Sequence, residues 1–171
     1  MKLPGTATQE ENIYVAMGKL NIHKDNVFLD IGCGSGAVSE AALRFTDKIY
    51  GIDSRPEAVA AAKLRVPSGI FLKGEAAELF SKVPQKIDRC FIGGTRNMSE
   101  FFPILIEKAN PDFVVVSNLA RLGMASKVVV LMKKYGVFHE FLQIQISRGY
   151  ELSGDLALKP VNPIFMVVGK C

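Results

Sequence analysis

Short apolar runs alternate along this chain with longer segments whose apolar residues recur every three or four positions. The short runs are rich in Val, Ile and Phe, as buried strands are, and the longer segments have the period of amphipathic helices. The expected strands are residues 27–31, 48–52, 69–72, 87–92, 113–116, 137–146 and 163–168. The expected helices are residues 35–45, 56–66, 76–82, 99–109 and 120–135, and residues 147–160 are expected to be a loop.

This succession of strand–helix units predicts a parallel sheet with helices on both faces. The connection before the last strand holds no expected helix, so the last strand is expected to run antiparallel. Pro56 suits the first turn of its helix, Ser99 is expected to cap the fourth helix, and Gly136 is expected to end the fifth. The chain contains no evident repeat or linker, and we expect one α/β domain over residues 1–171.

Composition excludes several classes of protein. Of the 171 residues, 49% are hydrophobic and 22% charged, which is typical of a globular domain rather than a disordered chain. The net charge of +4 favours an anionic ligand, but a nucleic-acid-binding protein usually has a denser basic patch. The three cysteines match no zinc-binding spacing, and no apolar run suits a signal peptide or a membrane span, so we expect a cytoplasmic protein without a metal site.

A glycine-rich loop joins the first expected strand to the first expected helix, which is the context that a nucleotide-binding fingerprint requires. Gly32 lets the chain turn off the strand, and Gly34 and Gly36 lack a Cβ that would keep a ligand from the backbone. Asp53 ends the neighbouring strand, where its carboxylate can accept both hydroxyls of a ribose. The combination predicts a ligand that contains adenosine.

Two classes of adenosine ligand are open at this point. Gly32, Gly34 and Ala37 satisfy the spacing G-x-G-x-x-A, which is typical of dehydrogenases that bind a dinucleotide. A nucleotide-binding module or an NAD-dependent dehydrogenase is therefore one hypothesis. A methyltransferase is the other, and its target could be a small molecule or RNA.

The loop also resembles motif I of the class I methyltransferases, which have a Rossmann-like fold and bind S-adenosylmethionine. The resemblance rests on the spacing from Asp30 through Gly36 and on the reversed last strand. It implies a seven-stranded, mostly parallel sheet of order 3-2-1-4-5-7-6 with an antiparallel last strand. It also implies that Glu75 and the backbone N–H of Ala76 face the adenine ring.

Four stretches carry a more specific pattern. They are Pro4-Gly5-Thr6-Ala7-Thr8-Gln9-Glu10, residues 28–36, Phe91-Ile92-Gly93-Gly94-Thr95, and Ser147-Arg148-Gly149-Tyr150 followed by Asn162-Pro163-Ile164. Together they resemble the decarboxylating C15-methyltransferases of cobalamin biosynthesis, which act on precorrin-6B or cobalt-precorrin-6B. The chain departs from that family at Thr95-Arg96-Asn97, which replaces a smaller, more glycine-rich continuation.

The resemblance implies methylation at C15 of the macrocycle together with loss of CO2 from the ring C acetate. It also implies a homotetramer and a separate C5-methyltransferase partner. Because the substrate is a tetrapyrrole with many carboxylates, cationic side chains are expected near the cleft, with Arg96, Arg121 and Arg148 as candidates. The Gly93-Gly94 pair leaves room for a bulky planar substrate, and the absence of an Asn-Pro-Pro-Tyr motif there argues against nucleic acid.

The predicted site has two parts. The predicted cofactor-binding residues are Thr8, Gly32, Cys33, Gly34, Ser35, Gly36, Asp53, Glu75 and Ala76. The predicted substrate-binding residues are Gly93, Gly94, Arg96 and Arg148. The sequence assigns no catalytic acid or base, because an electron-rich macrocycle carbon can attack a sulfonium methyl group without one.

Overall fold

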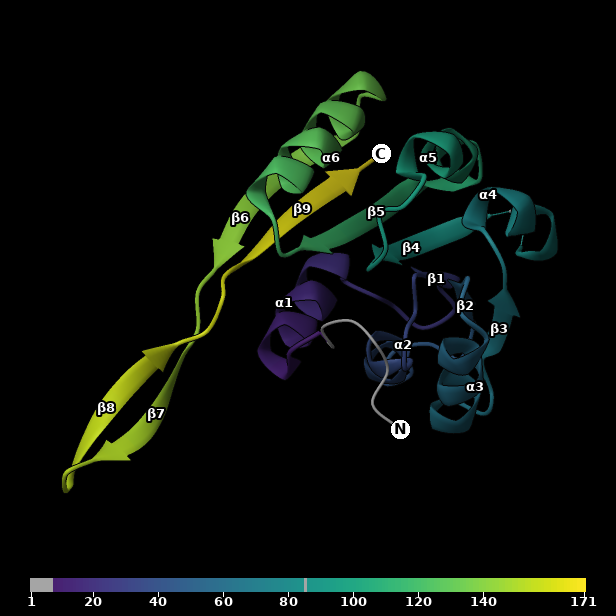
Figure 1. The fold of residues 1–171 in the computed structure, drawn as a ribbon. Helices are drawn as coiled ribbons and strands as arrows, with labels where there is room; N and C mark the ends of the chain where they lie inside the picture. The colour runs from purple at the N-terminus through teal and green to yellow at the C-terminus, as the bar shows by residue number, and fades with distance from the viewer. Residues whose placement is uncertain (1–7, 85) are drawn as a thin grey trace.

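The computed structural model describes residues 8–84 and 86–171, which form a mixed sheet between two helical layers and a long hairpin (Figure 1). The helices are α1 (Glu10–Leu20), α2 (Ala37–Ala42), α3 (Pro56–Arg65), α4 (Ala76–Leu79), the 3₁₀ turn η1 (Phe80–Lys82), α5 (Met98–Glu107) and α6 (Leu122–Lys134). The strands are β1 (Phe28–Ile31), β2 (Ile49–Asp53), β3 (Ile70–Lys73), β4 (Ile87–Ile92), β5 (Ala109–Leu119), β6 (Phe138–Ile144), β7 (Ser147–Leu152), β8 (Asp155–Pro160) and β9 (Ile164–Lys170).

Seven of these strands form one sheet in the order β3-β2-β1-β4-β5-β9-β6. The strands from β3 to β5 are parallel, and β9 runs antiparallel between β5 and β6. Figure 1 shows α4, α5 and α6 over one face of this sheet and α1, α2 and α3 over the other. The predicted fold class and strand order are confirmed, with β9 in the place of the expected seventh strand.

Each face of the sheet carries its own apolar core, and the alternation along β5 shows how the two are separated. Phe113 and Val115 pack with the helices α5 and α6, whereas Val114 and Val116 pack with residues of α1. Since successive side chains of a strand point to opposite faces, the even-numbered residues of β5 face α1. This parity decides the surroundings of Asn118 near the end of the strand.

Helix α1 has no counterpart among the expected elements. Its buried face consists of Ile13, Ala16, Met17 and Leu20, which recur at helical spacing before the first strand. Glu10 and Glu11 in the first turn also favour a helix start, because carboxylates are stabilised there by the helix dipole. The pattern was therefore present in the sequence, and the helix covers the sheet beside β4 and β5.

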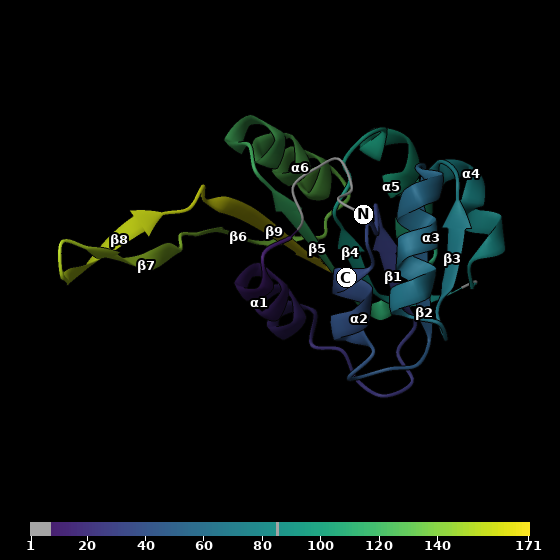
Figure 2. The same cartoon turned by 60° about the horizontal axis from the view of Figure 1, so that its bottom comes forward.

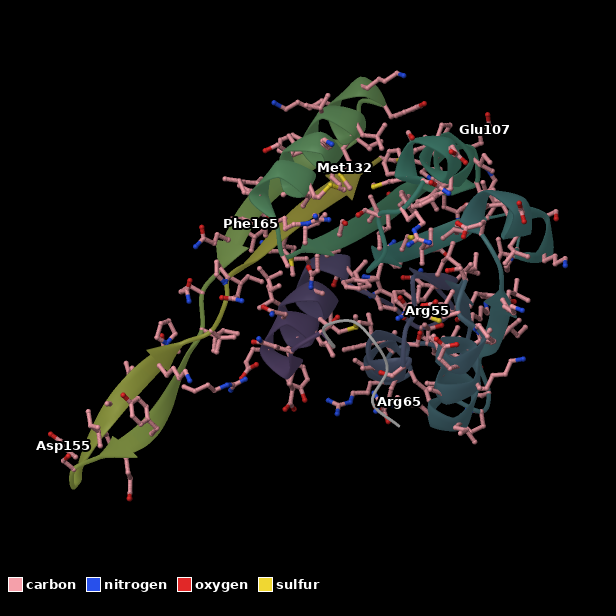
Figure 3. The ribbon with its side chains drawn as sticks, viewed as in Figure 1. Arg55, Arg65, Glu107, Met132, Asp155 and Phe165 are labelled. Carbon is pink, nitrogen blue, oxygen red and sulfur yellow. The ribbon has the colours of Figure 1, made fainter. Side chains whose placement is uncertain are left out.

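The prediction of a loop at residues 147–160 is wrong, because this segment forms the antiparallel hairpin β7–β8. Ser153 and Gly154 join its strands with φ values of 51° and 87°, as a two-residue turn with left-handed positions requires. The hairpin projects away from the rest of the molecule in both views (Figure 1, Figure 2), and Asp155 lies at its tip (Figure 3). We call residues 147–160 the hairpin arm.

Several element boundaries also differ from the expected ones. The expected cap at Ser99 is wrong, because Asn97 in a left-handed conformation precedes α5 and Ser99 lies within the helix. The expected end of α6 at Gly136 is confirmed by a φ of 71° just after the helix. In the described part of the chain, no helix has both the length and the apolar character that a bilayer span requires.

The loops that follow β1 and β4 touch each other through glycine backbone. A Cβ at Gly32 would lie 2.6 Å from the backbone nitrogen of Gly94, and Gly32 itself has a φ of +75°. Both the space and the conformation therefore require glycine at this position. Gly136 has a similar φ of +71°, but nothing lies within 4 Å of the place where its Cβ would be.

These two glycines form a matched pair for substitution. Gly136→Ala is expected to lower the free energy of unfolding by about 1–2 kcal/mol, since only the left-handed conformation is penalised. Gly32→Ala is expected to lower it by about 2–5 kcal/mol, because the clash with Gly94 adds to that penalty. Urea unfolding of both variants measures the difference, and equal losses would contradict a close backbone contact at Gly32.

Candidate active site

A cavity of about 340 Å³ opens at the carboxyl ends of β1, β2 and β4, where the direction of strand order reverses. In open α/β sheets this switch point is where ligands bind. The lining residues are Ile31, Gly32, Ile52, Asp53, Ser54, Arg55, Gly74, Glu75, Ala76, Gly93, Gly94, Arg96 and Phe101. The cavity therefore brings together seven predicted site residues from four separate loops.

Asp53 is the most heavily hydrogen-bonded side chain of the cavity. Its Oδ1 accepts hydrogen bonds from the Arg55 backbone N–H at 3.0 Å and from Arg55 Nε at 2.9 Å. Its Oδ2 accepts from the Gly34 backbone N–H at 2.9 Å and from Arg55 Nη2 at 3.0 Å. The carboxylate thus ties the glycine loop to the start of α3.

These contacts keep Asp53 ionised. Burial alone would raise the pKa of this carboxyl group, but the hydrogen bonds from the Arg55 side chain, the Arg55 N–H and the Gly34 N–H together lower it below its usual value. The Arg55 guanidinium has its own pKa raised by the same contact. The Arg55 side chain is 37% exposed, so the hydrogen bonds that it donates to Asp53 can be exchanged for those of a ligand.

Asp30, in contrast, is a buried carboxyl group with little compensation. Ser39 Oγ donates a hydrogen bond of 2.7 Å to its Oδ2, while Oδ1 is buried and has no partner in the part of the chain that the structure describes. Burial raises the pKa of Asp30 to about 7, against the hydrogen bond from Ser39 and with a smaller contribution from the charge of Asp53. Two neighbouring acids of the loop therefore differ in charge state near neutral pH.

The glycines of the loop have different roles. Gly34 contributes its N–H to Asp53, whereas a Cβ at Gly36 would meet the backbone and side chain of Ala62 at 3.0 and 3.1 Å. Gly36 therefore allows α2 and α3 to pack closely. The sequence predicts only that this glycine lets a ligand approach the backbone. Burial, followed by the charges of Asp30 and Asp53, raises the pKa of the Cys33 thiol and keeps it protonated. Of the predicted loop residues only Gly32 lines the cavity, and residues 33–36 do not belong to its lining.

The remaining predicted residues lie outside the cavity lining. Thr8 is half-buried just before α1, and Pro4-Gly5-Thr6-Ala7 of the same predicted stretch lie outside the described residues. Arg148 is on β7, where its guanidinium donates hydrogen bonds to the Glu11 carboxylate, with Nη2 at 2.9 Å from Oε2. Arg121 precedes the first residue of α6. Their roles in ligand binding stay predictions.

Six lining residues were not predicted as site residues from the sequence, and two of them, Arg55 and Phe101, have large side chains that reach the cavity from a loop and from α5. Arg55 stands two positions after Asp53, and this local spacing was a usable signal, because a backbone turn brings both side chains together. Phe101 reaches the cavity from the first turns of α5, and only the packing of that helix reveals it. Among residues 8–84 and 86–171, no group of three His, Cys, Asp or Glu side chains could hold a metal ion.

Comparison with known proteins identifies relatives over almost the whole chain. The sequence profile of a family described as "Precorrin methyltransferase domain" matches residues 3–169. A cobalt-precorrin-6B C(15)-methyltransferase (decarboxylating) of Methanosarcina acetivorans is 37% identical over 99% of this chain and 96% of its own length. The protein of the same name from Archaeoglobus fulgidus is 36% identical over 98% of this chain and 99% of its own.

A solved structure gives the same answer for the fold. The crystal structure of a precorrin 8w decarboxylase from Methanobacterium thermoautotrophicum superposes with a TM-score of 0.91 at 22% identity. The superposition covers 99% of this chain and 95% of that chain. At this level of identity the similarity supports the fold, and the family assignment depends on the sequence relatives.

The raised pKa of Asp30 predicts how stability changes with pH. An unfolded Asp ionises near 3.9, whereas the folded one stays protonated up to about pH 7, so ionisation favours the unfolded chain as pH rises between these values. Asp30→Asn removes this effect. Its stability relative to the wild type is expected to rise by roughly 1.4 kcal/mol per pH unit between about pH 4 and 7.

Urea unfolding of both proteins at half-unit steps of pH measures this difference. The free energy of unfolding of Asp30→Asn minus that of the wild type should increase as pH rises to about 7 and stay constant above it. Parallel curves from pH 4 to 7 would mean that the Asp30 carboxyl group ionises normally in the folded protein.

Proposed function

Because the chain belongs to the precorrin methyltransferase domain family, we propose that it methylates C15 of cobalt-precorrin-6B and removes CO2 from the ring C acetate, a step of cobalamin biosynthesis. The observation that carries the proposal is the 37% identity to a protein of that name over 99% of this chain. The fold and the cavity at the switch point are those that a methyltransferase of this class needs.

The proposed methyl donor, S-adenosylmethionine, is a substrate that supplies an electrophilic methyl group on a sulfonium. Three features of the cavity fit it. The Asp53 carboxylate is ionised and suited to ribose hydroxyls once the exposed Arg55 side chain gives up its hydrogen bonds. Ala76 begins α4 at the cavity wall, where its backbone N–H can face a ring nitrogen. The backbone at Gly32 carries no side chain that would block a ligand.

The substrate would approach from the ends of β4 and β5. Gly93 and Gly94 present bare backbone there, and Arg96 follows them as a cation for a macrocycle with many carboxylates. The reacting macrocycle carbon is electron-rich, so the chain's main contribution would be to align the two substrates and to exclude water. This methyl transfer does not need a general base, because the carbon attacks without first losing a proton.

The hairpin arm supports the proposal that the protein forms a homo-oligomer, a tetramer by family resemblance. Its large apolar side chains are exposed, with Tyr150 at 45%, Leu152 at 54%, Leu156 at 79% and Leu158 at 72%. The strand register places Tyr150 and Leu152 on one face of the arm and Leu156 and Leu158 on the other. A two-stranded hairpin of this kind gains stability when other chains cover it, and we propose that copies of the same arm do so.

The reaction is tested with purified protein, cobalt-precorrin-6B and S-adenosylmethionine, under reducing conditions that suit a cytoplasmic enzyme. The expected result is one methyl group gained and one CO2 released per substrate, measured by mass spectrometry and by trapping of CO2. If the protein methylates RNA or a small phenol but not the macrocycle, the proposed substrate is wrong and the methyltransferase acts on a different one.

Binding of the methyl donor is tested by calorimetric titration with S-adenosylhomocysteine and, separately, with NAD. We expect binding of S-adenosylhomocysteine alone, and we expect Asp53→Ala to weaken it by about tenfold or more, because two hydrogen bonds to a charged group are lost. Asp112→Ala is the control, since Asp112 is an exposed residue near the start of β5, at the opposite edge of the sheet. Binding of NAD alone would favour a dehydrogenase.

The oligomer is tested by light scattering after size exclusion. The wild type is expected near four times the chain mass of 18.7 kDa, and Leu156→Asp combined with Leu158→Asp is expected to reduce it to the mass of one or two chains. Burying two carboxylates in an apolar contact is strongly unfavourable, which is the reason for the effect. Leu64→Asp, on α3 at 85% exposure, is the control. An unchanged mass in the arm variant would exclude the arm from the interface.

A further inference from the structure

Helix α1 is tied at one end to β4 and at the other end to the base of the hairpin arm, and this fixes which of its residues lie near the cavity. The carbonyl of Asn21, just after the helix, accepts a hydrogen bond of 3.2 Å from Arg89 near the start of β4. At the other end Glu11 pairs with Arg148, which lies beyond the carboxyl end of β6. The helix therefore runs antiparallel to β4 and β5, and its first turn lies at the cavity edge of the sheet.

Three amide side chains toward this edge have buried polar atoms for which residues 8–84 and 86–171 offer no hydrogen-bond partner. They are Gln9 with Oε1, Asn12 with Oδ1, and Asn118 with both Nδ2 and Oδ1. Asn12 is only 1% exposed, and it lies on α1 beside the buried Ile13. Gln9 and Asn12 are three positions apart, so they are neighbours along one side of the first turn. We call these three residues the amide cluster.

Asn118 brings the cluster next to the cavity. It pairs with the buried Met166 of β9 and shares with Val116 the face of the sheet that α1 covers. The register of β4 and β5 pairs Ile92 with Ser117, and one step further Asn118 is level with Gly93. Gly93 lines the cavity and has no side chain, so neighbouring strands about 5 Å apart place the Asn118 amide at its border.

Charged groups of the first turn of α1 are engaged elsewhere. Glu10 accepts a hydrogen bond of 2.9 Å from the Tyr14 hydroxyl on the exposed side of the helix, and Glu11 is paired with Arg148. The cluster itself is neutral. The unpartnered atoms of Gln9 and Asn12 are oxygens, whereas Asn118 also has an unpartnered N–H₂ group. An amide that turns over by 180° exchanges its oxygen for its N–H₂ group, so Gln9 and Asn12 supply donors in the turned orientation.

Unpartnered buried amides are costly, and three of them toward the carboxyl ends of β4 and β5, next to a cavity whose lining they do not themselves form, indicate a ligand group that satisfies them. Resting on the proposed function, we propose that Gln9, Asn12 and Asn118 form a neutral binding site for a carboxylate, and that this carboxylate is the acetate lost as CO2. The chemistry of the proposed reaction explains why neutral donors would be used.

Loss of CO2 breaks the bond between the acetate methylene and its carboxyl carbon. The bonding pair enters the conjugated macrocycle and neutralises the positive charge that methylation at C15 adds, so atoms and charge balance without an oxidant, a reductant or an external proton. An arginine at the carboxylate would stabilise the negative charge before the bond breaks and so oppose this step. Amide donors orient the group at a smaller cost.

The experiment uses Asn118→Leu and Asn12→Leu, which keep the side-chain size and remove the amide. With cobalt-precorrin-6B labelled in the ring C acetate carboxyl group, we expect the ratio of CO2 released to methyl transferred to fall about tenfold, the effect of a lost hydrogen bond to a charged group. Affinity for S-adenosylhomocysteine should change less than about twofold. The melting temperature should stay the same or rise, because an unsatisfied buried amide has been removed.

Ser117→Ala is the matched control, since the neighbouring Ser117 Oγ already donates to the Ile92 carbonyl at 3.2 Å. It is expected to lower the melting temperature and to leave the ratio of the two products unchanged. Asn118→Asp adds a like charge and should depress CO2 release further than the leucine variant does.

Three outcomes would overturn the proposal, and each has its own signature. Weakened binding of S-adenosylhomocysteine in the leucine variants would assign the cluster to the carboxylate of the methyl donor's amino acid. A lower melting temperature with an unchanged product ratio would make the amides structural. A wild type that binds S-adenosylhomocysteine but releases no CO2 from the macrocycle would refute the proposed function itself, and the carboxylate assignment with it.

Discussion

The contact between Gly32 and the Gly93-Gly94 pair is the constraint on which the candidate site depends. β1 and β4 are hydrogen-bonded neighbours at the centre of the sheet, and the chain leaves both strands at the same level. A side chain at Gly32 would drive the two loops apart, since its Cβ would lie 2.6 Å from Gly94 nitrogen. The floor of the cavity is therefore bare backbone, and side chains with chemistry reach it only from its rim.

Two acids near the glycine loop differ in pKa: that of Asp53 at the rim is lowered, whereas that of Asp30, which is buried and does not line the cavity, is raised to about 7. Asp53 is stabilised as a carboxylate by Arg55 and the Gly34 N–H, whereas Asp30 is buried with a single hydroxyl partner. The proposed reaction brings a sulfonium and several carboxylates to the same cavity. A second ionised acid beneath the glycine loop would add repulsion toward those carboxylates, so the protonated form of Asp30 suits the proposed substrate.

The sheet could be predicted from the sequence because its central strands β1, β4 and β5 contain runs that are buried on both faces, and because glycines and helices bound the strands. The site followed from the same logic, since Gly32, Asp53 and Gly93 each stand at the end of a strand. The hairpin arm could not be predicted in this way, because its exposed strands carry no buried run and only the Ser153-Gly154 turn marks it. The position of Arg148 depends on that arm, so its ion pair with Glu11 could not be predicted from the sequence.

That pairing links two parts of the molecule that sequence patterns treat as separate. Arg148 belongs to the base of the hairpin arm, and Glu11 is the residue before Asn12 on the first turn of α1. Contacts that hold the arm in an oligomer would therefore also fix the end of α1 that carries Gln9 and Asn12. In place of the predicted direct role of Arg148 in substrate binding, we propose that the arginine positions the helix and that the amides contact the ligand.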